Sequence, residues 1–416
     1  MSAGDICSAC GIGKIYPSTP RISLQFKGNP PLECTRHIKL NLRCNACQIE
    51  FQAKGQANKW DYTAKTAIVL LKTMGMPWYR LANLQLLYNI PVAASTLWLQ
   101  CKGLFEDVGS YIISELFKQA AECNTYYVDD TPAKILEVIK ANKKLPLDQA
   151  KRSCRTTVIA TTTPQKHDIV LYLTGDAHCG ENLGKLLERK SNQRSHIRIM
   201  SDASTMNKPV TNDLILNRVI HINCLTHGRA KFADIESFYQ EQCGYFLAEI
   251  KSIYQNEDLI KEHKLSSKKR LLYHLKHSLP HLNNIYQKIN DLLQNKLVEP
   301  NSSLGKAMNY WVRNKKGLTM FTRVRNVALD NNLSERLLKY MILQRKNSLF
   351  FATKDSAVVL SGLTSLVETC RANQINASSY LNWIQENERD VQKNPANYLP
   401  WKFKEVMDNM KLASAA

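Results

Sequence analysis

Three acidic residues are placed where a chain would need them to hold two divalent metal ions against a phosphodiester. Asp129 and Asp202 each follow an apolar run that predicts a β-strand, and Glu335 lies in a polar stretch that predicts a late helix. Carboxylate oxygens with room for water select Mg²⁺ or Mn²⁺. Two such ions about 4 Å apart hold the attacking and leaving oxygens of an in-line displacement. We therefore predict that Asp129, Asp202 and Glu335 form a catalytic, magnesium-binding group.

Asp130 is the main competitor for the first of these positions. Neighbouring residues of a strand point to opposite faces of the sheet, so only one of Asp129 and Asp130 can reach the metals. An aspartate at the end of a strand is also often a turn former without a chemical role. The strand pattern alone therefore leaves the choice open.

The segments that must position these residues predict an α/β core. A first strand ends at Asp129, and after two further strands a helix leads to a fourth strand that ends at Asp202. A right-handed crossover would place this fourth strand beside and parallel to the first. The order is that of a ribonuclease-H-like sheet, with both aspartates at one edge. The other expected elements are strands 156–161, 169–173 and 218–223 and a helix at 181–188.

The charge of the chain favours an anionic partner. The 416 residues carry a net charge of +20, which suits nucleic acid or a membrane surface. Residues 256–325 alone contain 14 basic and 5 acidic side chains. No segment approaches the ~20 continuous apolar residues of a membrane span, and the first residues lack the features of a secretory signal. We therefore expect nucleic acid as the partner, a cytoplasmic location and no membrane contact.

Two CxxC pairs near the N-terminus predict a structural zinc ribbon. Cys7 and Cys10 form the first pair and Cys44 and Cys47 the second, with 33 residues between them. Two such turns close a tetrahedral site, and four thiolates leave no open position for a substrate. Cys34 or His37, which lie in the intervening loop, could replace one ligand, although both residue types also serve in ordinary packing.

Residues 60–121 carry apolar side chains at helical spacing and resemble a helix-turn-helix. One helix should end near Tyr88, and Ser95 could cap the next. In that arrangement Ser95, Thr96 and Gln100 would face the DNA groove. A plain helical linker is an equally good interpretation of this pattern.

Four short motifs follow one another in a fixed order. Residues 128–132 read Val-Asp-Asp-Thr-Pro, residues 224–232 contain C-x-x-H-x-R-x-K-F, residues 330–336 read Asp-Asn-Asn-Leu-Ser-Glu-Arg, and residues 345–350 read Arg-Lys-Asn-Ser-Leu-Phe. Together with the double CxxC, this order resembles the insertion-sequence-sixty-six family of bacterial transposases over essentially the whole chain. The alignment selects Asp129 over Asp130 and places Asp202 at the second aspartate of the family.

The resemblance implies a DDE-type DNA transposase that needs Mg²⁺ or Mn²⁺, with Zn²⁺ in the ribbon. Such an enzyme hydrolyses the ends of an insertion sequence and joins the freed 3′-hydroxyl to target DNA. Its partners would be double-stranded DNA at the element ends and the target, further copies of the chain in a synaptic complex, and small accessory proteins of the same element. The enzyme would act in the cytoplasm, at the nucleoid.

The resemblance also explains why 132 residues separate Asp202 from Glu335, because a minimal core needs far fewer. The expected regions are a zinc ribbon at 1–58, a helical DNA-binding domain at 59–122, the first part of the core at 123–233, a basic helical insertion at 234–316, the catalytic-glutamate helix at 317–352 and a C-terminal helical tail at 353–416.

Four basic residues on or after the glutamate helix are expected to contact DNA phosphates: Arg336, Lys339, Arg345 and Lys346. The roles of three other residues stay open. Cys224 and His227 could bind a metal or pack the insertion against the core, and Trp311 could stack on a base or lie in a core.

Two other functions compete with the transposase. Residues 204–208, Tyr340, Gln344 and Ser348 depart from the family pattern, and the ribbon lies almost at the first residue. These features would suit a truncated or inactive transposase that only binds DNA. A ribonuclease-H-fold nuclease or resolvase without strand transfer is the third possibility.

Overall fold

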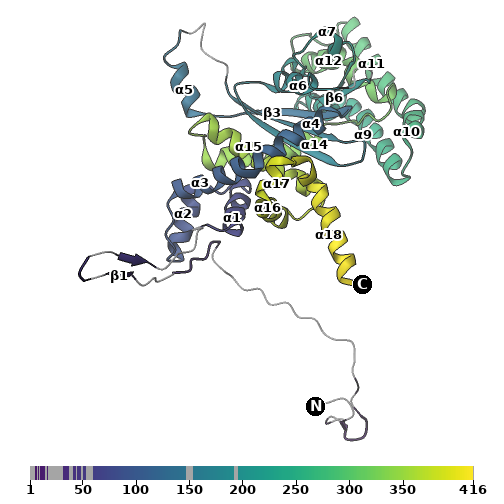
Figure 1. The fold of residues 1–416 in the computed structure, drawn as a ribbon. Helices are drawn as coiled ribbons and strands as arrows, with labels where there is room; N and C mark the ends of the chain where they lie inside the picture. The colour runs from purple at the N-terminus through teal and green to yellow at the C-terminus, as the bar shows by residue number, and fades with distance from the viewer. Residues whose placement is uncertain are drawn as a thin grey trace.

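The computed structural model describes residues 5–6, 8, 10–14, 16, 31–36, 41–43, 45–47, 50–52, 60–146, 153–191 and 195–415. A five-stranded mixed sheet lies in the order β5-β4-β3-β6-β7 (Figure 1). β3 pairs antiparallel with β4, and β4 pairs antiparallel with β5, whereas β3 and β6 and then β6 and β7 are parallel. The strands are β3 (Thr125–Pro132), β4 (Arg155–Thr162), β5 (Asp168–Gly175), β6 (Ile197–Ser201) and β7 (Val219–Asn223).

The strands and their order confirm the predicted α/β core, with one correction. Helix α6 (Cys179–Leu187) leads into β6, which runs parallel to β3 as the crossover rule requires. However, β3 does not end at Asp129, because β4 stays paired with it as far as Pro132. β6 accompanies β3 only as far as Tyr127. Asp129 therefore lies just beyond the parallel pairing, near the residue that follows β6.

Each face of the sheet packs against a different set of helices. On one face, Tyr126 and Val128 of β3 join a core that includes α6 and the N-terminal helices. On the other face, Val158 of β4 packs against Leu338 and Met341 of α14 (Asn332–Ser348). Since side chains alternate along β3, Asp129 shares a face with Tyr127, whereas Asp130 points to the side of Val128.

The N-terminal helices share the core of the sheet, with Leu81, Leu97 and Leu116 fully buried in it. The expected helix ends where the sequence places it, close to Tyr88. The predicted cap of the next helix is wrong, because the N-cap is Ala93 and Ser95 lies inside the first turn without a capping bond. The helices are α1 (Tyr62–Thr73), α2 (Trp78–Leu87), α3 (Ala94–Leu104) and α4 (Ser110–Ala121).

The segment between β7 and α14 is helical and forms a second core. Phe246 and Trp311 pack there with Met200 and Ile222, so this core continues from the ends of β6 and β7. The Trp311 indole N–H donates to the carbonyl oxygen of Gly228 at 2.9 Å, which makes Trp311 a core residue. The helices are α8 (Leu225–Ala233), α9 (Gln240–Glu262), α10 (Ser267–Tyr273), α11 (Leu279–Gln294), α12 (Ser303–Arg313) and α13 (Lys315–Leu318). The short helices α5 (Leu136–Asn142) and α7 (Asp213–Leu216) belong to connections within the sheet.

Helix α15 lies along β5, one of the two edge strands of the sheet, instead of extending as a tail. In Figure 1 it runs between the sheet and a group that contains α1, α3 and the last helices. Residues 359–370 of this helix are all buried. The C-terminal helices are α15 (Lys354–Ala372), α16 (Ala377–Glu386), α17 (Glu388–Lys393) and α18 (Pro400–Ala415).

Polar side chains at every fourth residue of α15 satisfy the open edge of β5. The Thr369 hydroxyl accepts from the Val170 N–H and donates to the Val170 carbonyl oxygen, both at 3.1 Å. Ser365 accepts from the Tyr172 N–H at 2.8 Å, and Asn373 bonds both backbone groups of Asp168. Four helical residues rise about 6 Å and two strand residues about 6.6 Å, so the two repeats match. The edge is thereby closed to further strands.

The CxxC segments are described only in part. An antiparallel bridge between Ile6 and Lys14 encloses the first pair, and the hairpin of β1 (Asn41–Arg43) and β2 (Glu50–Gln52) encloses the second. Cys7 and Cys44 lie outside the described residues, so the zinc ribbon stays a prediction. Among the described helices, none is both long and apolar enough to cross a lipid bilayer.

Candidate active site

Asp129 lies among acidic side chains from three elements. The pKa of Asp129 is raised to about 7, chiefly by burial and also by the charges of Asp202, Asp130 and Glu335, against a lowering hydrogen bond from the Asp130 N–H. That bond to Asp129 Oδ1 is 2.8 Å long. Mutual repulsion of this kind is relieved when cations lie between the carboxylates. Asp202 and Glu335 thus lie near enough for their charges to act on Asp129, although the three residues are 73 and 133 positions apart.

Asp202 is held by the loop that follows β6. Its Oδ1 accepts hydrogen bonds from the Ser204 N–H at 2.9 Å and from the Asn207 side-chain amide at 2.6 Å. The same loop packs on α6 so closely that a Cβ atom at Gly184 would clash with the Val210 carbonyl oxygen. This contact has no room for a side chain, so the glycine fixes the loop and, through it, the second aspartate.

Glu335 lies in the first turn of α14, where Asn331 ties the helix to its neighbours. The Asn331 side-chain amide donates to the Val128 carbonyl oxygen at 2.9 Å, and its backbone N–H donates to the Cys224 sulfur at 3.2 Å. Asn331 is fully buried. It therefore joins α14, β3 and the end of β7 at one point. The sequence pattern did not identify Asn331 as a link between these elements. A polar asparagine directly before a half-buried helix is the one local feature that points to it.

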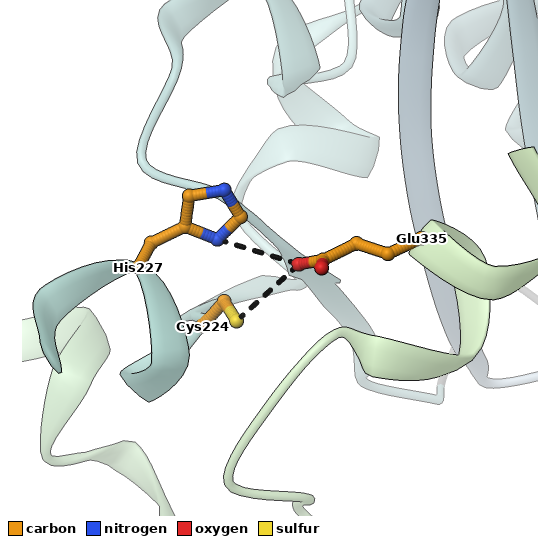
Figure 2. A group of neighbouring side chains, drawn as sticks. All are labelled: Cys224, His227 and Glu335. Atoms are coloured by element: carbon orange, nitrogen blue, oxygen red, sulfur yellow. Dashed lines mark hydrogen bonds and ion pairs between the residues drawn. The ribbon is translucent and has the colours of Figure 1, made fainter. Parts of the chain in front are cut away.

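Two side chains at the start of α8 approach Glu335: Cys224, which directly precedes the helix, and His227, in its first turn. The Cys224 sulfur lies 4.0 Å and the His227 Nδ1 lies 3.5 Å from Glu335 Oε1. Figure 2 shows both side chains directed at this one oxygen. The C-x-x-H spacing indicated that Cys224 and His227 act as a pair. Their partner Glu335, however, lies 108 residues after His227, and no local sequence pattern reveals this contact.

Asp130 is committed to another contact. One carboxylate oxygen forms an ion pair with Arg155 of β4, and the other accepts the Cys179 N–H at the start of α6 at 3.3 Å. Its side chain is 7% exposed. This arrangement satisfies Asp130 on the face of the sheet away from α14. The geometry thus favours Asp129 as the residue directed at Asp202 and Glu335.

The four basic residues of α14 do not share one environment. Arg336, Lys339 and Lys346 are exposed and fall on one face of the helix. Arg345 instead donates to the Thr131 hydroxyl at 3.0 Å and to the Pro132 carbonyl oxygen at 2.5 Å. Arg345 therefore fastens α14 to the end of β3, and the other three present their charges to solvent.

A basic cavity of about 390 Å³ opens beside Asp202. Lys208, Arg313 and Lys316 line it together with His221 of β7. Burial lowers the pKa of His221, and the charges of Lys208 and Lys316 lower it further. The cations come from the loop after β6 and from α12 and α13, so this concave surface connects these two helices to Asp202. The sequence identified residues 256–325 as basic, but it did not show that Arg313 and Lys316 of this region lie beside Asp202.

Comparison with known proteins gives the relationships of the chain. Residues 63–359 match the sequence model of a family described as Transposase IS66 family. Two uncharacterized proteins of Sinorhizobium fredii are similar in part. One, y4jD, is 25% identical over 159 residues, which are 38% of this chain and 30% of the relative. The other, y4qI, is 27% identical over 112 residues, 26% of this chain and 20% of the relative. The aligned part thus covers less than a third of either relative.

Proposed function

The chain belongs to the IS66 family of transposases, and on that premise we propose that it cleaves the ends of an insertion sequence and joins the 3′-hydroxyl to target DNA. The observation that carries this proposal is the placement of the carboxylates: Asp129 lies just past the parallel pairing of β3 with β6, near the residue that follows β6, and Asn331 bonds the start of the Glu335 helix to Val128. The raised pKa of Asp129, to which the charges of Asp202 and Glu335 contribute, supports it. Family membership implies that the protein binds DNA and uses a divalent metal. The proposal adds which residues carry out the chemistry.

The donor set at this site fits magnesium or manganese. Asp129, Asp202 and Glu335 would supply only carboxylate oxygens, the ligand type that these hard cations take. When bound, two such ions neutralise charge on the attacking and leaving oxygens of the phosphodiester. The Ser204 N–H and the Asn207 amide hold one oxygen of Asp202 in place, which leaves its other oxygen for the metal.

DNA is proposed to enter across the basic cavity and the exposed face of α14. Lys208, Arg313 and Lys316 would hold phosphates beside Asp202. Arg336, Lys339 and Lys346 would hold the strand near Glu335, whereas Arg345 acts mainly as a fastener of the helix. Contact between DNA and Ser95 and Thr96, the second and third residues of α3, remains part of the proposal. So do the zinc ribbon, the synaptic oligomer, the accessory proteins and a location at the nucleoid.

The expected regions are kept as proposals in the same way. Residues 234–316 would be an insertion that grips DNA, and residues 317–352 would carry the catalytic glutamate. The burial of α15 against β5 favours counting the first part of 353–416 with the core.

The test uses the full chain, Mn²⁺, and duplexes taken from the DNA that flanks its own coding sequence. We expect nicking at a fixed position and joining of the new 3′-hydroxyl to a second duplex. Asp129→Asn, Asp202→Asn and Glu335→Gln should each reduce both products roughly a hundredfold or more. Asp213→Asn, at an exposed acid of α7, is the matched control.

Three outcomes decide between the functions. Joined products that depend on all three carboxylates support the transposase. Nicking without joining would point to a nuclease. DNA binding with no carboxylate-dependent manganese uptake or cleavage would leave an inactive DNA-binding protein.

A further inference from the structure

We propose that Cys224, His227 and Glu335 form a second metal site, for an ion of the zinc class, that is distinct in its ligands from the proposed magnesium site. The three ligand atoms lie within 4.8 Å of one another. The site goes beyond the proposed function, since it needs neither aspartate and shares only Glu335 with it.

The distances in this group suit metal ligands better than hydrogen bonds. A nitrogen-to-oxygen hydrogen bond is normally about 2.7–3.2 Å long, whereas His227 Nδ1 and Glu335 Oε1 are 3.5 Å apart. Ligands around tetrahedral zinc, at about 2.0–2.1 Å for nitrogen or oxygen and 2.3 Å for sulfur, are roughly 3.3–3.5 Å from one another. The separations of 3.5 and 4.0 Å, with all three atoms within 4.8 Å of one another, need a contraction of about 1 Å or less to enclose an ion.

The His227 ring supplies an independent observation. Its Nδ1 atom is buried and has no hydrogen-bond partner among the described residues, although 38% of the side chain is exposed. Figure 2 shows this nitrogen turned toward the Glu335 carboxylate. A buried imidazole nitrogen whose polar neighbour, Glu335 Oε1, lies beyond ordinary hydrogen-bond length at 3.5 Å costs free energy, and a metal ion between the two atoms would satisfy both.

The backbone around Cys224 presents donors to its sulfur. The Asn331 N–H donates to the sulfur at 3.2 Å, and the residue lies directly before α8, where the positive end of the helix faces it. Burial nevertheless raises the pKa of the Cys224 thiol, and the Glu335 charge adds to this, against the hydrogen bonds from the backbone. The thiol proton therefore has to leave when a metal ion binds.

The donor set determines the ion. A thiolate and an imidazole select zinc or cobalt over magnesium, which prefers oxygen alone. Three protein ligands leave one position of a tetrahedral ion open for water or a phosphate oxygen. Both contacts end on Glu335 Oε1, so Oε2 stays available to the oxygen-only site. The carboxylate is thereby placed to serve two ions of different character.

Cobalt is the probe, because it reports thiolate ligation by a sulfur-to-cobalt charge-transfer band and four-coordination by its visible bands. The full chain is freed of metal with a chelator and then titrated with Co²⁺. The CxxC cysteines of the predicted ribbon give their own band in every variant, so the new site is read from the difference between wild type and variant. Wild type should bind one equivalent of Co²⁺ more than Cys224→Ser and show a stronger charge-transfer band, and His227→Gln should bind this additional equivalent at least tenfold more weakly.

Two controls keep this result separate from the transposase proposal. Cys243→Ser removes another fully buried cysteine of the same core and should leave the cobalt spectrum unchanged. Asp129→Asn should also retain it, even where all DNA cleavage is lost. The inference is overturned if wild type and Cys224→Ser show equal charge-transfer bands, or if His227→Gln binds cobalt like wild type.

Discussion

The side-chain amide of Asn331 is hydrogen-bonded at 2.9 Å to the carbonyl oxygen of Val128, the residue directly before Asp129. The same asparagine precedes α14 and lies four positions before Glu335. One buried side chain therefore sets the spacing between the strand that carries an aspartate and the helix that carries the glutamate. The separation of these two carboxylates depends on it.

Replacing Asn331 by alanine should separate the helix from the strand. Loss of the bond to Val128 leaves a buried carbonyl oxygen unpaired, so the free energy of unfolding should fall by about 1–3 kcal/mol. The Mn²⁺ affinity of the folded protein should fall at least tenfold. Urea unfolding and calorimetry measure the two effects. Asn332→Ala, a half-buried neighbour, should change stability by no more than about 0.5 kcal/mol; equal metal affinity in both variants would contradict a positioning role.

Asp129→Asn should stabilise the protein when magnesium and manganese are absent, and more so at high pH. The folded state raises the pKa of Asp129 from 3.8 to about 7, so the folded state prefers the protonated acid and loses stability as pH rises through this window. The whole shift corresponds to roughly 4 kcal/mol; because the site is partly open to water, we expect about 1–2 kcal/mol at pH 8. Urea unfolding at pH 5 and pH 8 checks this. A gain that is equal at both values would show that the charge is not responsible.

The hydrogen bonds from hydroxyl groups of α15 to the backbone of β5 predict that two similar Thr→Val substitutions differ in their effect on stability. Thr369→Val removes the partner of both backbone groups of Val170, so stability should fall by about 1–3 kcal/mol. Thr364→Val is the matched control. Its hydroxyl donates only to the Leu360 carbonyl oxygen of its own helix, so its loss leaves no backbone group of β5 unpaired. Chemical denaturation should rank the two variants in this order, and equal losses would mean that the edge of β5 gains little from α15.

DNA affinity should depend on the cavity beside Asp202. Lys316→Ala and Lys208→Ala each remove one cation of its lining. If each contacts a phosphate, the slope of log affinity against log salt should fall by roughly 0.7–0.9 for each substitution. Lys402→Ala, which breaks only a surface ion pair with Glu405, should leave the slope unchanged. Fluorescence anisotropy over a range of salt concentrations measures it, and parallel lines for all variants would place the DNA elsewhere.

The sheet was predictable because its strands are runs of β-branched and aromatic residues with clear ends. Residues 156–161 and 169–173 were expected, and β4 and β5 extend these ranges by only one or two residues at each end. The end of β3 was misplaced because Asp129 and Asp130 resemble a turn, whereas pairing with β4 carries the strand on to Pro132. Tertiary pairing prevailed over local propensity there.

The parts that could not be predicted are contacts between distant segments. Nothing near Ser365 or Thr369 shows that their hydroxyls meet the backbone of β5, almost two hundred residues earlier. The approach of Cys224 and His227 to Glu335 is of the same kind. Periodicity reports the face of one element, but it does not report which element covers that face.

The late position of α15 in the chain has a consequence for biosynthesis. A growing polypeptide delivers β3, β4 and β5 early, but the helix that closes β5 begins only at Lys354. The ribosome thus releases both aspartates long before the glutamate of α14 and before the strand edge is covered. Native contacts of such large sequence separation form slowly. The proposed site of three carboxylates therefore needs a segment that is made late in translation, so we expect an interrupted product that ends before α14 to lack it.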